Sequence, residues 1–407
     1  MVKLAVYFDT SPSDGGGFQQ SLRTLRMLLG EERIRKYEVK VYVSNEQIKA
    51  TLRLIEIQST VLILEKNLLI FQRLRKEIGL ITKSKLFQKL MPSNQIEKYL
   101  VAEGVDLVYF LSPNSIAEYL EKVNFIYTVW DVSHIQNHEF PEVRGNWQIE
   151  YRESKLNHIL PRAHSIVVES EYTKRQLTKR YGLDSDRMYI IPPQPLIETA
   201  VSLNGTSCSF KQVKTIDIAR FDRYILYPAQ FWPHKNHVFL LAALKHFLAN
   251  KWGSLKMVFT GGDKGDHMSY VTEKSVDLEL SEEVFFLGFV SQEHILSLYK
   301  NAFALAMPSY FGPTNLPPVE AFEIGLPVLA PLRDDHKEFL GDGALYFDYT
   351  APSSLALLFK RLISEEGLRD SLIRKGKSQL TYIRGKSEFN KLINKIDEFE
   401  HLRECWR

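Results

Sequence analysis

The segment MPSYFGPTNLPPVEAFEIGLPVLA, residues 307–330, decides the fold class of the second half of this chain. Its apolar ends predict two buried strands, and the stretch between them predicts one helix. Pro317 and Pro318 mark the first turn of that helix, where a missing backbone N–H is tolerated. A strand, a helix and a second strand in succession indicate a parallel α/β sheet.

The same alternation of strands and helices continues through the whole chain. Apolar runs typical of strands lie in the second half at 224–227, 256–260, 284–289, 303–307, 327–330 and 344–347. An earlier series lies at 4–8, 39–43, 105–111, 125–129, 165–168 and 188–191. Consecutive apolar residues suit strands that are covered on both faces. The sequence therefore predicts two doubly wound, Rossmann-like α/β domains that face a ligand cleft with the carboxyl ends of their strands.

The expected domains are residues 1–200 and 223–385, with a linker at 201–222. Two domains suit a chain of 407 residues, which is longer than one ordinary core. Residues 192–215 are polar and rich in turn formers, as expected of an exposed linker. Residues 386–407 are helical in pattern, and we expect them to pack across the domain junction.

The composition disfavours several classes of protein. The 52 Lys and Arg nearly balance the 49 Asp and Glu, so bulk charge gives no reason to expect nucleic acid as a partner. The two cysteines, Cys208 and Cys405, have no metal-ligand spacing and form no disulfide framework, in keeping with a reducing compartment. We find no signal peptide and no apolar run of the ~20 residues that a membrane-spanning helix needs. A cytoplasmic protein is expected.

Residues 68–90 combine apolar positions with an excess of basic residues. An amphipathic helix with a solvated basic face explains this pattern, and so does a segment that contacts anionic lipid. The second interpretation would place the protein peripherally on the inner face of a membrane.

Two loops of the first half carry candidate binding residues. Gly15, Gly16 and Gly17 follow the first predicted strand and precede a helix, where backbone amides can approach an anion. A flexible surface loop is the alternative. Asp131 and His134 follow the fourth predicted strand; Asp131 can accept hydrogen bonds from sugar hydroxyls, and His134 can bind a hydroxyl or a phosphate. A helix cap or a turn is the alternative for both.

The second half places a lysine and two glycines beyond its first two strands. Lys235 stands at an expected helix start, where its ammonium group and the helix dipole both attract phosphate. A lone solvated lysine is the alternative. Gly261 and Gly262 follow the next strand and permit close approach of the backbone.

Within 307–330, Gly312, Thr314 and Asn315 are expected to form a loop whose amides point at a ligand. Glu320 is expected in the first turn of the following helix. It either complements the helix dipole, worth about 0.3–1 kcal/mol, or accepts hydrogen bonds from both vicinal hydroxyls of a ribose.

The segments FLGFVSQEHILSLYKNA, PSYFGPTNLPPVEAFEIGLPV and GALYFD resemble the donor domain of glycosyltransferase family 4, which has the GT-B fold. The resemblance covers essentially the full chain and is strongest over 224–348. It implies a retaining hexosyltransferase of polysaccharide biosynthesis that uses a nucleoside diphosphate sugar, with no cofactor and no essential metal. WDVSH and PTNLPP are similar to bacterial polysaccharide enzymes, which favours mannose or a deoxyhexose such as rhamnose. The implied acceptor is a saccharide or a lipid-linked saccharide.

The resemblance also implies roles for individual residues. Lys235 would bind the diphosphate, Glu320 the ribose, and Phe289 and Val290 would border the base. Our mechanistic hypothesis adds that domain closure brings Asp131 and the loop of Gly15 to Gly17 onto the sugar. The expected catalytic residues are Asp131, Lys235 and Glu320. The expected donor-binding residues also include Gly15, Gly16, Gly17, His134, Gln230, Gly262, Phe289, Val290, Thr314, Asn315 and Leu316.

Two positions depart from the family pattern. Gly312 stands where a glutamate is common, and Gln230 stands where an arginine is common. The resemblance therefore places this chain in a variant subgroup with a PTN-type loop. A catalytically inert nucleotide-sugar-binding module and a sugar-nucleotide epimerase or hydrolase stay open as alternatives. The D-x-D pattern at Asp184 and Asp186 suits a turn better than a metal site.

Overall fold

The computed structural model describes residues 2–62, 95–195, 212–213, 216–263, 266–312 and 314–406. By its internal contacts the chain divides into two compact units. Unit 1 contains Met1–Val132, Glu150–Ile191 and Glu388–Arg407, and unit 2 contains Ser133–Ile149 and Pro192–Ser387. Residues 133–149 group with unit 2, and the C-terminal residues group with unit 1. The expected domain bounds at 200 and 223 stay predictions.

Unit 1 is built on a seven-stranded sheet in which all neighbours are parallel, in the order β3-β2-β1-β4-β5-β6-β7. Its strands are β1 (Lys3–Phe8), β2 (Glu38–Val43), β3 (Thr60–Val61), β4 (Leu107–Phe110), β5 (Asn124–Val129), β6 (Ser165–Val168) and β7 (Met188–Ile190). The apolar runs of β1 and β4 are buried nearly throughout, as expected of central strands covered on both faces.

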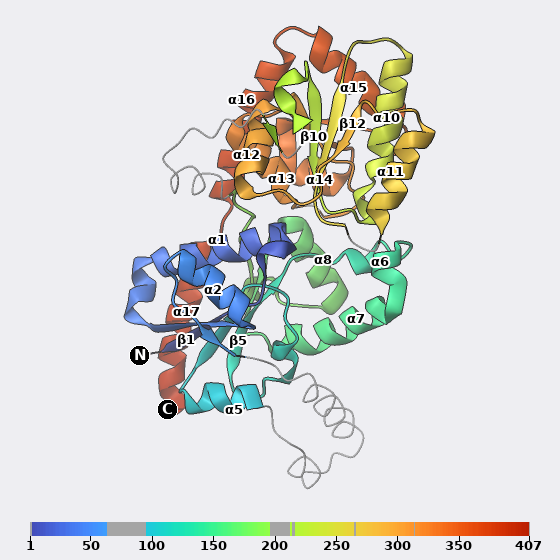
Figure 1. The fold of residues 1–407 in the computed structure, drawn as a ribbon. Coiled ribbons are helices and arrows are strands. Elements are labelled where there is room, and N and C mark those ends of the chain that lie inside the picture. Colours follow the sequence, from blue (N-terminus) through green and yellow to red (C-terminus); the bar gives the residue numbers. More distant parts are fainter. Residues whose placement is uncertain are drawn as a thin grey trace. The chain divides into compact units, whose positions relative to one another are not determined.

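Helices surround this first sheet (Figure 1). They are α1 (Gly16–Gly30), α2 (Glu46–Leu54), α5 (Gln95–Ala102), α7 (Gln148–Ile159), α8 (Glu171–Tyr181) and α17 (Phe389–Arg403). The C-terminal helix α17 buries Ile393 and Ile396 fully, and its Arg403 Nε lies 2.9 Å from Asp106 Oδ1. These contacts anchor α17 within unit 1. Its expected packing across the domain junction stays a prediction.

Unit 2 is built on a six-stranded parallel sheet in the order β12-β11-β10-β13-β14-β15. Its strands are β10 (Tyr224–Pro228), β11 (Lys256–Thr260), β12 (Val284–Phe286), β13 (Ala304–Ala306), β14 (Val328–Pro331) and β15 (Ala344–Phe347). A short antiparallel pair, β8 (Gln212–Val213) and β9 (Ile216–Asp217), precedes it. The helices are α6 (Pro141–Arg144), α10 (His237–Ala249), α11 (His267–Asp277), α12 (Gln292–Asn301), α13 (Leu316–Ile324), α14 (Asp334–Leu340), α15 (Pro352–Ser364) and α16 (Leu368–Gly385).

Alternation along β10 explains why the second sheet has two hydrophobic layers. Ile225 and Tyr227 belong to one buried cluster, which α10, α11 and α15 complete. Tyr224 and Leu226 belong to a second cluster, which α12, α13 and α16 complete. Figure 1 shows these two sets of helices on opposite sides of the sheet. Because successive side chains of a strand point to opposite faces, one strand supplies both layers.

The strand order reverses once in each sheet, between β1 and β4 in unit 1 and between β10 and β13 in unit 2. Ligands of doubly wound sheets bind beyond the carboxyl ends of the strands at such a reversal. The prediction of two doubly wound, Rossmann-like domains is confirmed. In unit 2 the loops after β10 and β13 are therefore the first place to look for a site.

Candidate functional site

The loop after β10 presents Lys235 beside the loop after β13. Lys235 ends a short 3-10 turn, Pro233–Lys235, and Asn236 adopts a left-handed conformation with φ 54° before α10 begins. The Tyr227 hydroxyl donates to the Lys235 carbonyl at 2.9 Å and holds this turn onto β10. The half-buried Lys235 Nζ donates to Asn315 Oδ1 at 2.9 Å. The fold thus brings together two residues that the sequence predicted separately.

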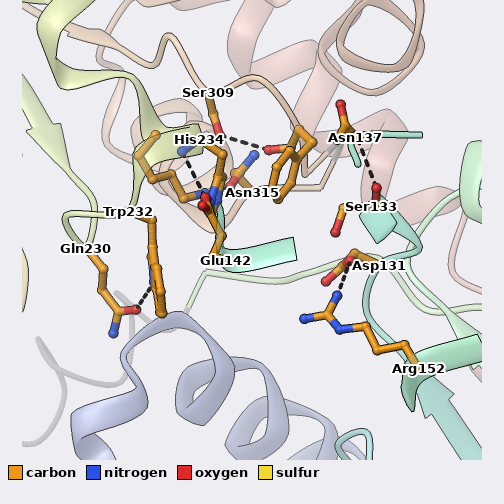
Figure 2. Close-up of polar contacts among 12 residues, drawn as sticks. Asp131, Ser133, Asn137, Glu142, Arg152, Gln230, Trp232, His234, Ser309 and Asn315 are labelled. Carbon is orange, nitrogen blue, oxygen red and sulfur yellow. Dashed lines mark hydrogen bonds and ion pairs between the residues drawn. The ribbon is translucent and has the colours of Figure 1, made fainter. Parts of the chain in front are cut away.

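The loop after β13 has its own internal hydrogen bonds. The side-chain amide of Asn315 donates to the Gly312 carbonyl, and the Ser309 hydroxyl donates to the Phe311 carbonyl at 2.8 Å, which Figure 2 shows. Gly312 has φ +92°, and a Cβ there would lie 3.1 Å from Nδ2 of Asn315. The backbone at position 312 therefore suits glycine, and any larger side chain would press on the residue that holds Lys235.

Glu320 lies deeper in α13 than the sequence indicated. The helix begins at Leu316, so Glu320 stands one full turn inside it, and the helix has no acidic residue in its first turn. The helix-dipole interpretation of Glu320 therefore loses its support. The buried Tyr299 hydroxyl donates to Glu320 Oε2 at 2.6 Å. Burial raises the pKa of Glu320 to about 7, although the hydrogen bond from Tyr299 opposes this rise.

The glycines after β11 allow two loops to cross. Gly261 has φ +136°, and a Cβ there would lie 2.2 Å from the Ala229 carbonyl oxygen, so only glycine fits. The Gly262 carbonyl accepts a hydrogen bond from Phe231 N at 3.1 Å, and no atom of the described residues lies within 4 Å of a Cβ built on Gly262. The backbone around Gly262 is therefore open to a ligand.

Gln230, in the loop after β10, accepts a hydrogen bond from the Trp232 indole at 3.0 Å, so its side-chain amide is held within that loop (Figure 2).

The remaining predicted donor residues of unit 2 differ in exposure. Phe289 is 60% exposed and Val290 packs at the edge of the core, as residues bordering a planar ligand would. Thr314 is half-buried. Leu316 is buried in the core cluster, so only its backbone can face a ligand.

One residue that the sequence did not single out contacts the Lys235 turn. Glu142 Oε1 accepts a hydrogen bond from His234 N at 3.0 Å and lies 2.5 Å from His234 Nδ1 (Figure 2). The His234 ring stacks on Phe311 with centroids 3.9 Å apart, and the Phe140 ring lies 5.4 Å from that of Phe311. These contacts attach α6 and Phe140 to both loops. The segment HEFPE carries no local pattern that indicates this partner.

In unit 1 the glycine loop lies at the reversal between β1 and β4. Gly15 is the N-cap of α1 with φ 61°, and no atom lies within 4 Å of a Cβ built on Gly15 or Gly16. Gly17 differs, because a Cβ there would lie 2.8 Å from the Trp130 ring. Packing against Trp130 thus accounts for Gly17. Beside this loop, Asn114 Nδ2 donates to Asp9 Oδ2 at 2.6 Å, a pair that the sequence did not predict.

Asp131 and His134 fall in different units although they are close in sequence. The Asp131 carboxylate lies 3.7 Å from Arg152 Nη1, and both side chains are partly exposed. His134 is only 1% exposed, and its carbonyl lies 3.0 Å from His138 Nδ1. The roles expected of both residues stay predictions.

Two other expectations concern metal and membrane. Asp184 accepts a hydrogen bond from Asp186 N at 2.9 Å, so the D-x-D pattern forms a turn. Among the residues that the structure describes, no group of three or more His, Cys, Asp or Glu could hold a metal ion. Within the same ranges no helix has both the length and the apolar character needed to span a bilayer. The basic stretch at 68–90 lies outside the described residues.

Known proteins share both the sequence pattern and the fold. Residues 16–193 match the profile of Glycosyltransferase Family 4, and residues 211–379 match that of Glycosyl transferases group 1. The chain also resembles a crystal structure of a glycosyltransferase from Rickettsia africae, with a TM-score of 0.68 and 16% identity, covering 98% of this chain and 97% of that one. Anabaena HepE in complex with UDP and glucose has a TM-score of 0.63 and 14% identity, covering 98% and 100% of the two chains.

Among curated relatives, the O-antigen chain mannosyltransferase RfbU of Salmonella typhimurium is 28% identical over 216 residues. That match covers 52% of this chain and 54% of the relative, so the chain spans about half the length of this relative. Two Rossmann-like units with these neighbours define a protein of the GT-B fold. The two profiles, matched one after the other, show that the chain belongs to glycosyltransferase family 4.

Proposed function

We propose that this chain is a retaining hexosyltransferase of polysaccharide biosynthesis, which moves a hexose from a nucleoside diphosphate sugar to a saccharide or lipid-linked saccharide. The observation that carries the proposal is the hydrogen bond of 2.9 Å between Lys235 and Asn315, at the strand-order reversal of unit 2. A cation held in a loop beyond the carboxyl ends of the strands suits the diphosphate of a nucleotide sugar.

Different residues of unit 2 would bind different parts of the nucleotide-sugar donor. Lys235 would bind the diphosphate, and Glu320 would accept hydrogen bonds from the ribose hydroxyls. Phe289 and Val290 would border the base, while the backbone near Gly262 and Thr314 would approach the phosphates. Negative charge grows on the departing diphosphate, so a fixed cation stabilises the transition state more than the ground state.

Mannose, or a deoxyhexose such as rhamnose, is the proposed sugar. The Salmonella relative is named for mannose transfer to the O-antigen chain, and HepE was crystallised with UDP and glucose. The first name supports a hexose as the transferred sugar, and the second supports a nucleoside diphosphate as its carrier. The roles of Asp131, His134 and the glycine loop, and membrane contact through residues 68–90, stay predictions.

Thermal-shift screening with GDP, UDP, dTDP and ADP and their sugars tests the proposal first, because a ligand bound only by the native state raises the melting temperature. Release of the nucleoside diphosphate together with a glycosylated product would support the transferase. NMR of the product anomer would then test retention. No shift with any nucleotide would overturn the proposal.

One observation favours a second candidate, a nucleotide-sugar-binding module without turnover. Gln230 is engaged by Trp232, and Gly312 has a backbone that suits glycine, so neither position offers the charge common in the family. Binding of a nucleotide sugar by calorimetry, with no product in any acceptor panel, would support this module over the transferase.

A further inference from the structure

Glu142 is a largely shielded carboxylate, and one of its two oxygens accepts hydrogen bonds from His234. Its Oε1 accepts the hydrogen bond from His234 N at 3.0 Å and lies 2.5 Å from the ring nitrogen of the same residue. The side chains of Glu142 and His234 are each 11% exposed. The pair is therefore largely shielded from water, and the contacts with His234 hold Glu142 beside the turn that carries Lys235.

The second oxygen, Oε2, is also buried and has no hydrogen-bond partner within the described part of the chain. Burial raises the pKa of Glu142, but its hydrogen bonds with His234 outweigh burial and bring the pKa below its ordinary value. Glu142 is thus charged near neutral pH. A buried, charged oxygen without a donor is unfavourable unless a ligand or water supplies the hydrogen bond.

The surroundings of Glu142 indicate which chemical group of a ligand would donate a hydrogen bond to Oε2. His234 directly precedes Lys235, and its ring stacks on Phe311, which directly precedes Gly312. Figure 2 shows the Glu142 carboxylate at the His234 side chain. A phosphate would be attracted by Lys235 and repelled by Glu142. Neutral hydroxyl groups would instead donate to a carboxylate in strong hydrogen bonds.

We propose that binding of the nucleotide sugar uncovers Glu142 Oε2, which then accepts hydrogen bonds from hydroxyls of the hexose that is transferred. Glu142 then binds the sugar while Lys235 binds the diphosphate, and the carboxylate reaches the donor site from α6 and not from the loop at Gly312. This assignment rests on the proposed function, because it needs a nucleotide sugar as the ligand.

The test distinguishes two roles of Glu142: direct binding of the sugar, and structural support of the turn that carries Lys235. The nucleoside diphosphate with the largest thermal shift and its sugar conjugate are titrated by calorimetry into the full chain. The variants are Glu142→Gln, which keeps the shape and one acceptor oxygen, and Glu142→Asp, which keeps the charge but withdraws the oxygens. Glu139→Gln is the matched control, because Glu139 is an exposed acid of the same segment.

The expected result is a loss of affinity for the nucleotide sugar of about tenfold or more in both Glu142 variants. Affinity for the nucleoside diphosphate should change less than about twofold, and Glu139→Gln should behave as wild type in both titrations. Equal losses for the two ligands would show that Glu142 only supports the turn, and no loss for either would also overturn the assignment. A wild-type chain that binds neither ligand would overturn the proposed function itself, a distinct result.

Discussion

The Nζ of Lys235 donates a hydrogen bond to Oδ1 of Asn315 at 2.9 Å, across 80 positions of sequence. The pair fixes an otherwise mobile ammonium group beside the start of α13. Preorganisation of this kind lowers the free energy needed to arrange the site when charge develops on a leaving group.

Lys235→Ala should lower turnover by about 100-fold or more, because one fixed donor to a developing charge contributes on that scale. Initial rates of nucleoside diphosphate release measure this. Lys245→Ala is a suitable control, since it removes only a surface ion pair of 2.7 Å with Glu279. Turnover of Lys235→Ala within a few-fold of wild type would disprove the assignment.

Nucleotide affinity should rise with pH through about 7, because burial raises the pKa of Glu320 to about 7 and the ionised form is the better acceptor for ribose hydroxyls. Calorimetry at pH 6 and pH 8 measures this. In Glu320→Gln the affinity should be lower and independent of pH over that range. A wild-type profile as flat as that of the variant would contradict the role of Glu320.

The raised pKa of Glu320 has the opposite effect on the stability of the ligand-free protein, which should fall as the pH rises. The folded chain takes up a proton at Glu320 between its ordinary pKa of 4.5 and about 7, so the contribution of this group is fully present below 4.5 and falls as the pH approaches 7. Urea denaturation at several pH values should show a steeper fall for wild type than for Glu320→Gln. Parallel profiles would argue against the raised pKa.

Tyr299→Phe should move the midpoint of the nucleotide pH profile upward, because the hydrogen bond from Tyr299 lowers the pKa of Glu320. Tyr224→Phe is the matched control. It removes another buried hydroxyl, which donates to the Leu298 carbonyl at 2.6 Å, and leaves Glu320 untouched. A similar midpoint in both variants would contradict this coupling.

Gly312→Glu, which installs the acid common in the family, should destabilise the protein and lower activity. A non-glycine residue at φ +92° is strained by roughly 1–2 kcal/mol, and its Cβ would press on Asn315. Gly312→Ala has the same strain without the carboxylate and serves as the comparison. Thermal melting and donor turnover measure both effects, and an active, undiminished Gly312→Glu would show that the loop adapts.

Gly376→Ala should destabilise unit 2 by about 1–3 kcal/mol through overpacking, because a Cβ there would lie 2.6 Å from the Phe322 ring. Gly385→Ala, at the end of the same helix, has no atom within 4 Å and should be neutral or slightly stabilising. Chemical denaturation compares them, and equal stabilities would disprove the packing argument.

The strands were predictable because a parallel strand that is buried on both faces consists of consecutive apolar residues. β6, β11 and β15 match their expected ranges to the residue. β12 ends at Phe286, short of the expected end at residue 289, because Gly288 turns the chain with φ 59° and its carbonyl accepts from Gly261 N at 2.9 Å. Such a turn depends on a partner loop that local patterns do not contain.

The sequence alone determined two doubly wound domains, the family resemblance and the positions of Lys235, Asn315 and Glu320 beyond strand ends. Tertiary structure decided their surroundings: the backbone of Gly312, the hydrogen bond of Tyr299 that adjusts Glu320, and the approach of Glu142 to His234 across 92 positions. The physical reason is that apolar periodicity and turn chemistry act over a few neighbouring residues. Burial, pKa and distant hydrogen bonds depend on which loops the strand order brings together.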